Sequence, residues 1–284
     1  MSTNPLHRFF RRPALWVRLP TLGKWYAGHE LDMNESGEIE IYGLTAVDDV
    51  MLNTPDALLN GQALEHVIQS CAPAVKNVRR MMQPDLDAIY LAIKSATNNG
   101  KYELERKCPK CQHENNFEVN CNALLDNMTY VEDSDCIVEI DNQLTIHIKP
   151  YDYEMRSLLL QRQFEEQRTL AQIEKETDGL DEFKRAEILG QSVERLTRLT
   201  FDLVAGTISA IDILGPEPVR VSDKKQIAEW LSNVSKGTAD AVIGAVNDLN
   251  LIGPPKSTHA VCESCSNEWE EQLSFDPVVF FGRS

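Results

Sequence analysis

The sequence predicts an α+β fold in which a helical domain interrupts a small mixed domain of strands and helices, and three observations predict it. Residues 102–148 contain two pairs of alternating apolar and charged segments separated by turn residues, a pattern typical of β-hairpins. Residues 152–213 contain no proline and carry apolar residues at helical spacing, a pattern typical of long amphipathic helices. A Cys-x-x-Cys pair lies on each side of this helical stretch.

The composition is that of a globular chain with room for one large or two modest domains: 284 residues, 42% hydrophobic and 25% charged. Its net charge of −16 argues against a nucleic-acid partner, because binding to a phosphate backbone relies on Lys and Arg. No apolar run approaches the ~18–20 residues of a membrane span, and the first residues lack the apolar segment of a secretion signal. We therefore expect no membrane span and a reducing compartment.

Residues 1–15 form a predicted basic N-terminal arm. The stretch is rich in arginine and phenylalanine, it is interrupted by Pro5 and Pro13, and the first acidic residue of the chain is Glu30. Two interpretations remain open. The arm is either a frayed terminus or a segment that becomes ordered only against a partner.

Residues 16–150 form the predicted α+β domain, which also carries the first cysteine pair. Alternating residues predict its strands, and caps or breakers such as Pro73 and Gly100 bound its helices. The first hairpin should carry a cysteine knuckle at its tip. The expected elements are strands at 16–20 and 38–42, helices near 46–51, 63–71 and 85–97, and hairpins at 102–119 and 136–148.

Residues 151–253 form the predicted inserted helical domain. Long amphipathic helices are expected at 152–177 and 181–213, and the tight turn between them makes an antiparallel helical hairpin. A Gly- and Pro-containing linker at 215–218 then leads into two shorter helices.

Residues 254–284 bring the chain back to the first domain with the second cysteine pair. The tail carries Phe275, Phe280 and Phe281 and is too apolar to remain a free end. We therefore expect it to pack on the first domain.

The two Cys-x-x-Cys pairs are the strongest functional signal in the chain. Cys108, Cys111, Cys262 and Cys265 supply four thiolates, and Zn²⁺ prefers a tetrahedral set of such ligands. About 150 residues separate the pairs, whereas roughly 15–20 separate them in the familiar ribbon pattern. The sequence therefore predicts a split four-cysteine zinc ribbon, with a domain inserted between its halves.

Other interpretations of these cysteines remain open. The pairs form two half-sites completed by His113 or His259, or they are buried thiols without a metal. A redox motif is less favoured, because it needs its first cysteine at a helix start and the residues here predict a turn. The remaining cysteines, Cys71, Cys121 and Cys136, are expected to be free and buried.

The sequence contains no recognisable catalytic motif. It has no nucleophile elbow, no phosphate-binding glycine loop and no His-Glu-x-x-His, and its six histidines are scattered. A zinc ion with four protein thiolates has no open position for a substrate, so it is structural. We expect that the protein is not an enzyme.

A series of further motifs follows the chain in order. Together with the two cysteine pairs, the series resembles the baseplate hub proteins of T-even-like phages with contractile tails. The likeness covers most of the chain and is weakest in residues 152–210 and in the arm. The motifs are Leu19–Tyr26, Glu38–Ala46, Pro55–Gly61, Val67–Pro73, Asp85–Ile93, Cys108–Cys111, Cys262–Cys265, Phe275–Pro277 and Phe280–Phe281.

The resemblance implies a structural component of the phage tail baseplate hub, with no catalysis. Its implied partners are other hub or wedge proteins, tail tube proteins or the tape measure, in a symmetric multi-subunit assembly. Its implied location is the virion tail, with the host cytoplasm during assembly. Two alternatives remain: a non-virion chaperone for the hub or tape measure and, more remotely, a zinc-ribbon regulator that binds nucleic acid.

Overall fold

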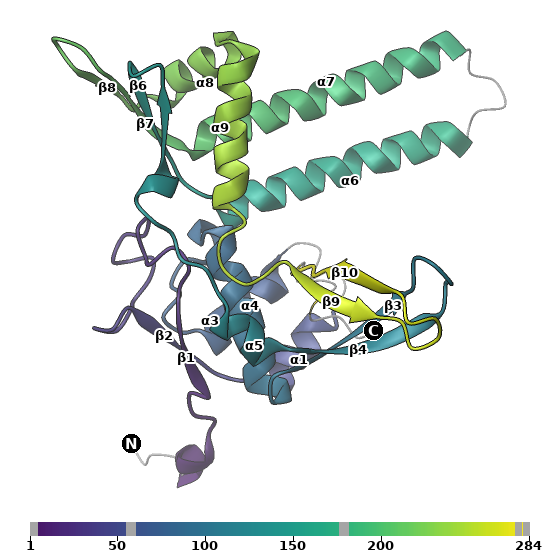
Figure 1. The fold of residues 1–284 in the computed structure, drawn as a ribbon. Helices are drawn as coiled ribbons and strands as arrows, with labels where there is room; N and C mark the ends of the chain where they lie inside the picture. Colours follow the sequence, from purple (N-terminus) through teal and green to yellow (C-terminus); the bar gives the residue numbers. More distant parts are fainter. Residues whose placement is uncertain (1–4, 55–60, 176–181, 276–279, 281–284) are drawn as a thin grey trace. The chain divides into compact units, whose positions relative to one another are not determined.

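The structure is a computed structural model of the chain, and it describes residues 5–54, 61–175, 182–275 and 280. The fold mixes helices with several small antiparallel sheets, which agrees with the predicted α+β class (Figure 1). The chain divides into two compact units. The first comprises residues 1–131 and 251–284, and the second comprises residues 132–250.

The first unit contains three two-stranded sheets, each of which is an antiparallel pair. Strand β1 pairs with β2, β3 with β4, and β9 with β10. The elements in chain order are η1 (Pro5–Phe9), β1 (Leu15–Arg18), β2 (Glu38–Ile41), α1 (Ala46–Leu52), α3 (Gln62–Cys71), η2 (Val78–Arg80), α4 (Gln83–Asn98), β3 (Lys101–Lys107), β4 (Glu114–Asn120), α5 (Cys121–Asp126), β9 (Ser257–Val261) and β10 (Glu268–Gln272).

Helix α4 lies at the centre of the first unit. Its apolar residues Leu86, Ile89 and Ile93 are fully buried, and the helix contacts β1, β2, α3, α5 and β3. The helix ends at Asn99, which adopts a left-handed backbone with φ 53°. Because these apolar side chains are buried, α4 is the scaffold on which the β1–β2 pair and the β3–β4 hairpin are placed.

A buried carboxylate fixes the segment after β1 to α4. Asp85 is fully buried, and its carboxylate accepts hydrogen bonds from the Thr21 backbone N–H at 2.9 Å and hydroxyl at 2.5 Å, and from the Tyr26 hydroxyl. Burial raises the pKa of Asp85 to about 6, although these donors act in the opposite direction. The segment therefore has one fixed attachment to the core.

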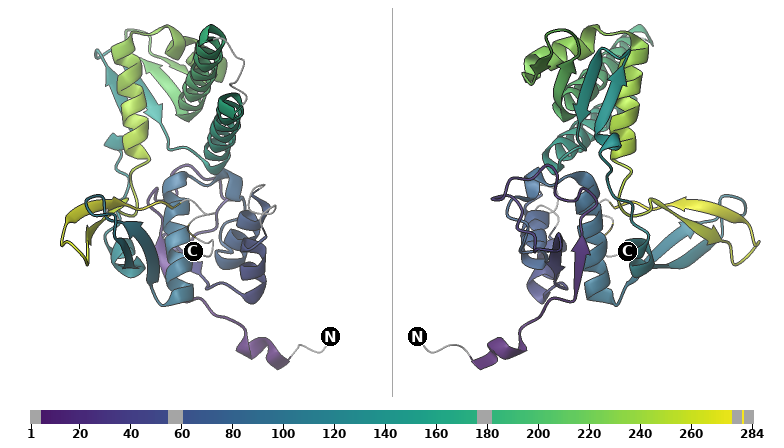
Figure 2. Two further views of the ribbon diagram at one scale, coloured as in Figure 1. Left: turned by 90° about the vertical axis from the view of Figure 1, so that its right-hand side faces the viewer. Right: turned by 60° about the vertical axis from the view of Figure 1, so that its left-hand side comes forward.

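The second unit is built on a four-stranded antiparallel sheet in the order β5-β6-β7-β8. Helices α6 and α7 run beside each other as an antiparallel pair, and α9 contacts the edge strand β5 (Figures 1 and 2). The elements are η3 (Ser134–Cys136), β5 (Ile137–Ile140), β6 (Leu144–Ile148), α6 (Tyr153–Lys175), α7 (Glu182–Thr207), β7 (Ile208–Ile213), β8 (Val219–Val221), α8 (Lys224–Asn233) and α9 (Lys236–Leu249).

The boundary between the units differs from the predicted one. The sequence predicts a first domain that runs to residue 150, whereas the first unit of the structure ends at Val131. The hairpin of β5 and β6 lies in the second unit because β6 also pairs with β7, which follows the long helices. On the C-terminal side the chain returns at Leu251, close to the expected residue 254.

Strand β7 replaces the predicted end of the second long helix. The helix is expected to reach Ile213, but it ends at Thr207 and residues 208–213 form a strand. Isoleucine and the alternating Ser-Ala-Ile-Asp-Ile pattern favour a strand where a sheet edge is available for pairing. Edge strand β8 begins at Val219, directly after the predicted linker at residues 215–218.

One backbone pair closes the first unit where the second unit is inserted. Thr129 and Gly253 exchange both backbone hydrogen bonds at 3.0 Å. Gly253 has φ +97°, and a Cβ at this position would lie 3.1 Å from the Pro20 side chain and 3.4 Å from the Pro84 carbonyl oxygen. Glycine is therefore needed here for both backbone conformation and space.

Within the parts of the chain that the structure describes, no helix combines the length and the apolar character that crossing a membrane requires.

Candidate metal centre

The first cysteine pair lies at the tip of the hairpin formed by β3 and β4. Seven residue pairs, from Lys101↔Asn120 to Lys107↔Glu114, hold the two strands together. The inward side chains Tyr102, Leu104 and Val119 are buried at the base of the hairpin. Alternation of polar and apolar residues thus anchors one face of the hairpin and leaves the tip to the cysteines.

The second cysteine pair lies at the tip of the shorter hairpin formed by β9 and β10. Five residue pairs, from Ser257↔Gln272 to Val261↔Glu268, hold these strands together. Among the described residues of these two strands, only Ala260 in β9 is buried. Strand β10 alternates half-buried and exposed residues.

The first knuckle closes with two backbone hydrogen bonds. The N–H of Cys108 donates to the carbonyl of His113 at 2.9 Å, and the N–H of Gln112 donates to the carbonyl of Cys108 at 2.9 Å. Gln112 has a left-handed backbone with φ 61°. This turn points both Sγ atoms toward one side of the hairpin tip.

The second knuckle has the same two backbone hydrogen bonds as the first. The N–H of Cys262 donates to the carbonyl of Asn267 at 2.9 Å, and the N–H of Ser266 donates to the carbonyl of Cys262 at 3.0 Å. Ser266, which follows the second cysteine as Gln112 does, has φ 53°. Two different sequences therefore adopt the same local backbone.

The four sulfur atoms meet in one cluster. Sγ of Cys108 lies 3.7 Å from Sγ of Cys265, and Sγ of Cys111 lies 3.6 Å from Sγ of Cys262. All four lie within 4.8 Å of one another. Cys108 and Cys262 are buried, whereas Cys111 is exposed and Cys265 is intermediate. Each buried cysteine thus faces the more exposed cysteine of the other knuckle.

This arrangement has the dimensions of a tetrahedral thiolate site. At a Zn–S distance of about 2.3 Å, tetrahedral ligands lie about 3.8 Å from one another. The two shortest separations, 3.6 and 3.7 Å, are close to that value. The residues therefore fit Zn²⁺, and all four coordination positions would be filled by the protein.

The first cysteine of each knuckle has a lowered pKa. Burial raises the pKa of Cys262, but hydrogen bonds from the N–H groups of Cys265 and Ser264 and from neighbouring thiols outweigh burial and lower it to about 6. The pKa of Cys108 is also lowered, because donors including the N–H groups of Cys111 and Lys110 outweigh burial.

The more exposed cysteine Cys111 behaves in the opposite way. The N–H of His113 lowers the pKa of Cys111, but the thiols of Cys265 and Cys262, together with burial, raise it to about 12. Neighbouring thiolates repel one another, so the four thiols do not ionise together by themselves. A divalent cation would remove this repulsion, so the chemistry of the four thiols suits a bound cation.

Asn115 connects the two knuckles and was not anticipated from the sequence. Its side chain is buried, its Nδ2 donates to the His113 carbonyl at 2.9 Å, and its Oδ1 accepts from the Glu263 N–H at 2.9 Å. In the sequence it belongs to a polar run that predicts a turn, and nothing there marks it as a bridge.

Two side-chain contacts extend the connection below the knuckles. The rings of Phe117 in β4 and Trp269 in β10 pack edge to face with centroids 5.6 Å apart. The Arg106 guanidinium lies 2.7 Å from the Glu271 carboxylate. Apolar and ionic contacts therefore join the hairpins along their length.

The tail after β10 packs into the first unit. Phe280 is buried, its ring lies 4.8 Å from that of Tyr102 in β3, and its carbonyl accepts a hydrogen bond from the Lys94 Nζ at 3.1 Å. Phe275 is buried beside Phe280, with centroids 5.6 Å apart. Phe281, which was also expected to pack, lies outside the described residues.

The other candidate ligands do not join the cluster. His259 lies 3.4 Å from the Glu268 carboxylate and is exposed, and His113 contributes its backbone carbonyl. Cys71 and Cys121 are buried and Cys136 is intermediate, and the described metal-ligand cluster includes none of these three. Burial raises the pKa of both Cys71 and Cys121 to about 11, which keeps these thiols protonated.

Comparison with known proteins identifies the family. A family model described as T4 bacteriophage base plate protein matches residues 43–282, most of the chain and both cysteine pairs. The chain belongs to this family. The predicted resemblance to T-even-like baseplate proteins is thereby confirmed. No curated protein and no solved structure gives a match.

Family membership gives the protein a structural role in a phage baseplate. It implies a place in the virion tail and interaction with other tail or baseplate proteins. A structural family of this kind also suggests a protein without enzymatic activity. The matched segment begins at Gly43, so the arm and the sheet of β1 and β2 precede it.

Proposed function

We propose that this baseplate protein is a component of the hub and that Cys108, Cys111, Cys262 and Cys265 bind one structural zinc ion. The proposal rests above all on the four sulfur atoms that lie within 4.8 Å of one another. They come from two hairpins separated by the whole second unit. Within the first unit, the ion would fasten the C-terminal hairpin of β9 and β10 to the hairpin of β3 and β4.

Energetic magnitudes support a structural role for the ion. Closing a loop of roughly 150 residues costs about 5 kcal/mol of chain entropy. Zinc binding to a four-ligand structural site contributes about 10–16 kcal/mol. The metal therefore offsets the closure cost with a margin, and it leaves no coordination position for a substrate.

Metal analysis of the purified full-length chain tests the zinc proposal. We expect one zinc ion per chain, and replacement by Co²⁺ should give the absorption bands of a tetrahedral thiolate site. Cys262→Ser should abolish both, and Cys136→Ser, a cysteine outside the cluster, should leave both unchanged. Metal-free protein with an intact fold, or a Cys262→Ser variant that retains the metal, would overturn the proposal.

The hub role is tested separately, on phage particles. We expect the protein in mass spectra of purified virions and of isolated baseplates, and its depletion should leave tails without a completed hub. Recovery of the protein from assembly intermediates but not from mature virions would replace the hub component with an assembly chaperone. Proximity labelling in infected cells would then identify the baseplate proteins that it contacts.

A further inference from the structure

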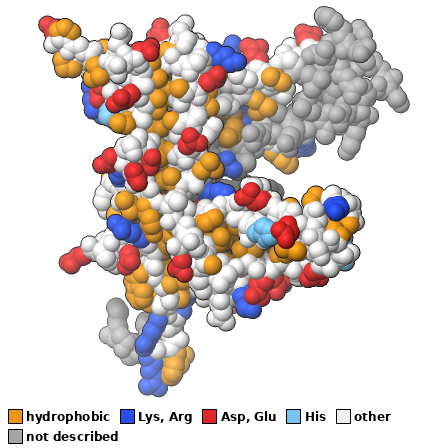
Figure 3. Space-filling view, in the orientation of Figure 1, with side chains coloured by type: hydrophobic (Ala, Val, Ile, Leu, Met, Phe, Trp, Pro, Cys, Tyr) orange, Lys and Arg blue, Asp and Glu red, His pale blue; other side chains and the backbone are white. Residues whose placement is uncertain are grey.

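The N-terminal arm, residues 5–12, projects from the first unit and combines aromatic with basic side chains. The side chains of Leu6, Phe9 and Phe10 are 58%, 70% and 58% exposed. Figures 1 and 2 show η1 extending away from β1 and from the remainder of this unit. In the space-filling view, hydrophobic and basic side chains lie together at its tip (Figure 3).

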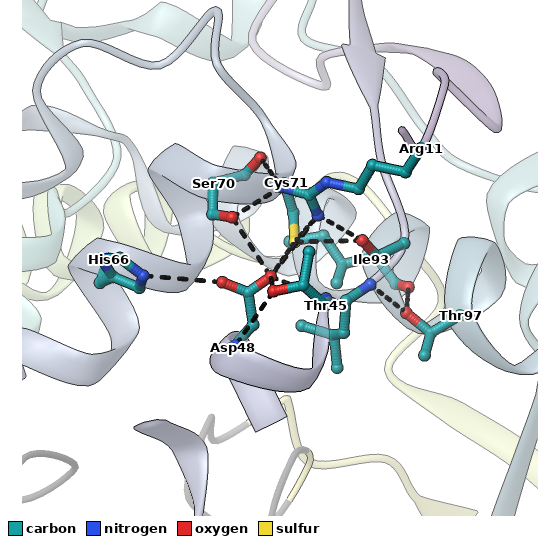
Figure 4. A network of polar contacts seen from close by, with 10 residues as sticks. Arg11, Thr45, Asp48, His66, Ser70, Cys71, Ile93 and Thr97 are labelled. Carbon is teal, nitrogen blue, oxygen red and sulfur yellow. Dashed lines mark hydrogen bonds and ion pairs between the residues drawn. The ribbon is translucent and has the colours of Figure 1, made fainter. Parts of the chain in front are cut away.

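Arg11 fixes the root of the arm to its own subunit. Its guanidinium donates to the Ser70 carbonyl and hydroxyl, both at 2.6 Å, and to the Gly43 carbonyl (Figure 4). It also lies 3.5 Å from the buried Asp48 carboxylate and 5.4 Å from the centre of the Tyr42 ring. These contacts are numerous enough that the arm leaves the unit from a fixed point.

A surface cleft on the same unit has the complementary character. Its volume is about 280 Å³, and it lies along the sheet of β1 and β2. Trp16 is 55% exposed, so an aromatic surface is available there. Three carboxylates and a single lysine, Lys76, line the cleft. Its apolar lining is Trp16, Met33 and Ile39, and its acidic lining is Asp32, Glu38 and Glu40.

The direction of the chain carries the arm away from the cleft of its own subunit. In the sheet, Leu15 pairs with Ile41 and Arg18 pairs with Glu38. The arm continues past the Ile41 end toward Gly43, where Arg11 binds, whereas the cleft extends from Trp16 toward the Glu38 end. The cleft is therefore better placed to bind the arm of another subunit than the arm of its own subunit.

We propose that residues 5–10 of one copy, the part of the arm beyond its attachment at Arg11, bind in the β1–β2 cleft of a second copy of this chain. Residues 1–29 carry five basic and no acidic residues, so the remainder has a net charge of −21 within the total of −16. Opposite charge steers the arm to the cleft, and burial of Phe9 or Phe10 against Trp16 supplies apolar contact. The inference does not depend on the zinc site or on the hub assignment.

The contact is heterologous, because the arm and the cleft are different surfaces. Repetition of such a contact produces a ring when the rotation between copies closes, and an open chain when it does not. The chain therefore carries both halves of a contact that can repeat around an axis.

The test compares charge-reversal variants of the full-length protein by sedimentation velocity over a concentration series. The wild type should self-associate, and high salt should weaken the association because the contact is partly ionic. Arg8→Glu/Phe9→Ala (arm variant) and Asp32→Lys/Glu38→Lys (cleft variant) should each raise the dissociation constant at least about tenfold. Lys225→Glu, which makes the same charge change as Arg8→Glu at an exposed lysine elsewhere, should behave as wild type.

A mixture of the two variants distinguishes loss of the arm–cleft contact from misfolding of either variant. The arm variant keeps an intact cleft and the cleft variant keeps an intact arm, so an equimolar mixture should form dimers that grow no further. A photo-crosslinker at position 9, in a mixture of isotopically light and heavy protein, should join light to heavy chains.

Several outcomes would overturn the proposal. One is a wild type that stays monomeric, and another is an arm or cleft variant that associates as the wild type does. A mixture that remains monomeric contradicts it as well. Crosslinks confined to one chain would assign the arm to its own cleft, and crosslinks only to a different phage protein in infected-cell lysate would assign it to another partner.

Discussion

The two hairpins of the metal centre have the same tip and different bases. In both, the first cysteine donates to the carbonyl five residues later, and the residue after the second cysteine has a positive φ. The β3–β4 hairpin has seven residue pairs and follows α4 directly, whereas the β9–β10 hairpin has five pairs and follows the inserted unit.

The charges of the two hairpins differ as well. The first knuckle is flanked by Arg106, Lys107 and Lys110, whereas the second carries a run of glutamates that includes Glu263 and Glu268. Basic side chains offset the net charge of −2 on a zinc ion with four thiolates. The two knuckles therefore share one backbone geometry, whereas the charges around them and the contacts at their bases differ.

Metal removal should have the largest effect, and it should affect the two hairpins to different degrees. In chelator-treated protein, and in Cys108→Ser and Cys262→Ser alike, we expect hydrogen exchange to rise strongly in β9–β10 and modestly in β3–β4. The reason is that Tyr102, Leu104 and Val119 keep the first hairpin on the core. Hydrogen–deuterium exchange with mass spectrometry measures both hairpins in one experiment. Equal loosening of the two hairpins would show that their bases do not differ in strength.

Loss of Asn115 should have the next largest effect. Asn115→Ala removes the buried amide that bonds to the His113 carbonyl and the Glu263 N–H, and we expect a loss of about 1–3 kcal/mol in the free energy of unfolding. Asn116→Ala, the exposed neighbour, is the matched control and should change stability little. Denaturant unfolding of the zinc-loaded protein measures the difference. Equal values for the two variants would remove Asn115 as the bridge between the knuckles.

The ion pair between Arg106 and Glu271 should contribute less. A double-mutant cycle with Arg106→Gln and Glu271→Gln should give a coupling of about 0.2–1 kcal/mol that declines with salt, because both groups are partly solvated. The more exposed pair Lys101 and Glu118, which lies within one hairpin, provides the control cycle and should show weaker coupling. A coupling that does not change with salt would show that it comes from packing of the Arg106 side chain and not from its charge.

Glycine at the two positive-φ positions should give the smallest change, and it should be a gain. A left-handed backbone costs an L-residue roughly 1–2 kcal/mol, and glycine avoids that cost but loses about 0.5–1 kcal/mol of chain entropy. Gln112→Gly and Ser266→Gly should therefore each stabilise by up to about 1 kcal/mol. Gln272→Gly, in a strand, should destabilise. Unequal gains at the two knuckles would show that their turns differ despite similar φ values.

The local part of the cysteine cluster could be predicted from the sequence. A Cys-x-x-Cys spacing, turn residues and alternating flanks predict the first pair on a hairpin tip, and the structure has both pairs on hairpin tips. The approach of Cys108 to Cys265 could only be a hypothesis, since it depends on how the whole chain returns. Asn115 could not be found, because a buried bridge and a solvated turn residue have the same local sequence.

The errors in the fold come from pairing between distant segments. The helical spacing of the preceding residues predicts a helix that continues to Ile213, whereas pairing with β6 and β8 makes residues 208–213 the strand β7. The same pairing draws the hairpin of β5 and β6 into the second unit and moves the boundary from residue 150 to Val131. Tertiary contacts override local propensity at these positions.

The mutual hydrogen bonds of Thr129 and Gly253 have a consequence for the evolution and engineering of this chain. The points at which the chain leaves and re-enters the first unit, near Thr129 and Gly253, are adjacent, so the residues between them form an insertion that could be exchanged as a unit. A short turn in place of residues 132–250 would rejoin the first unit at a preformed junction, and a foreign domain with adjacent termini could be grafted there. Such a replacement would leave both cysteine knuckles in place, because both belong to the first unit.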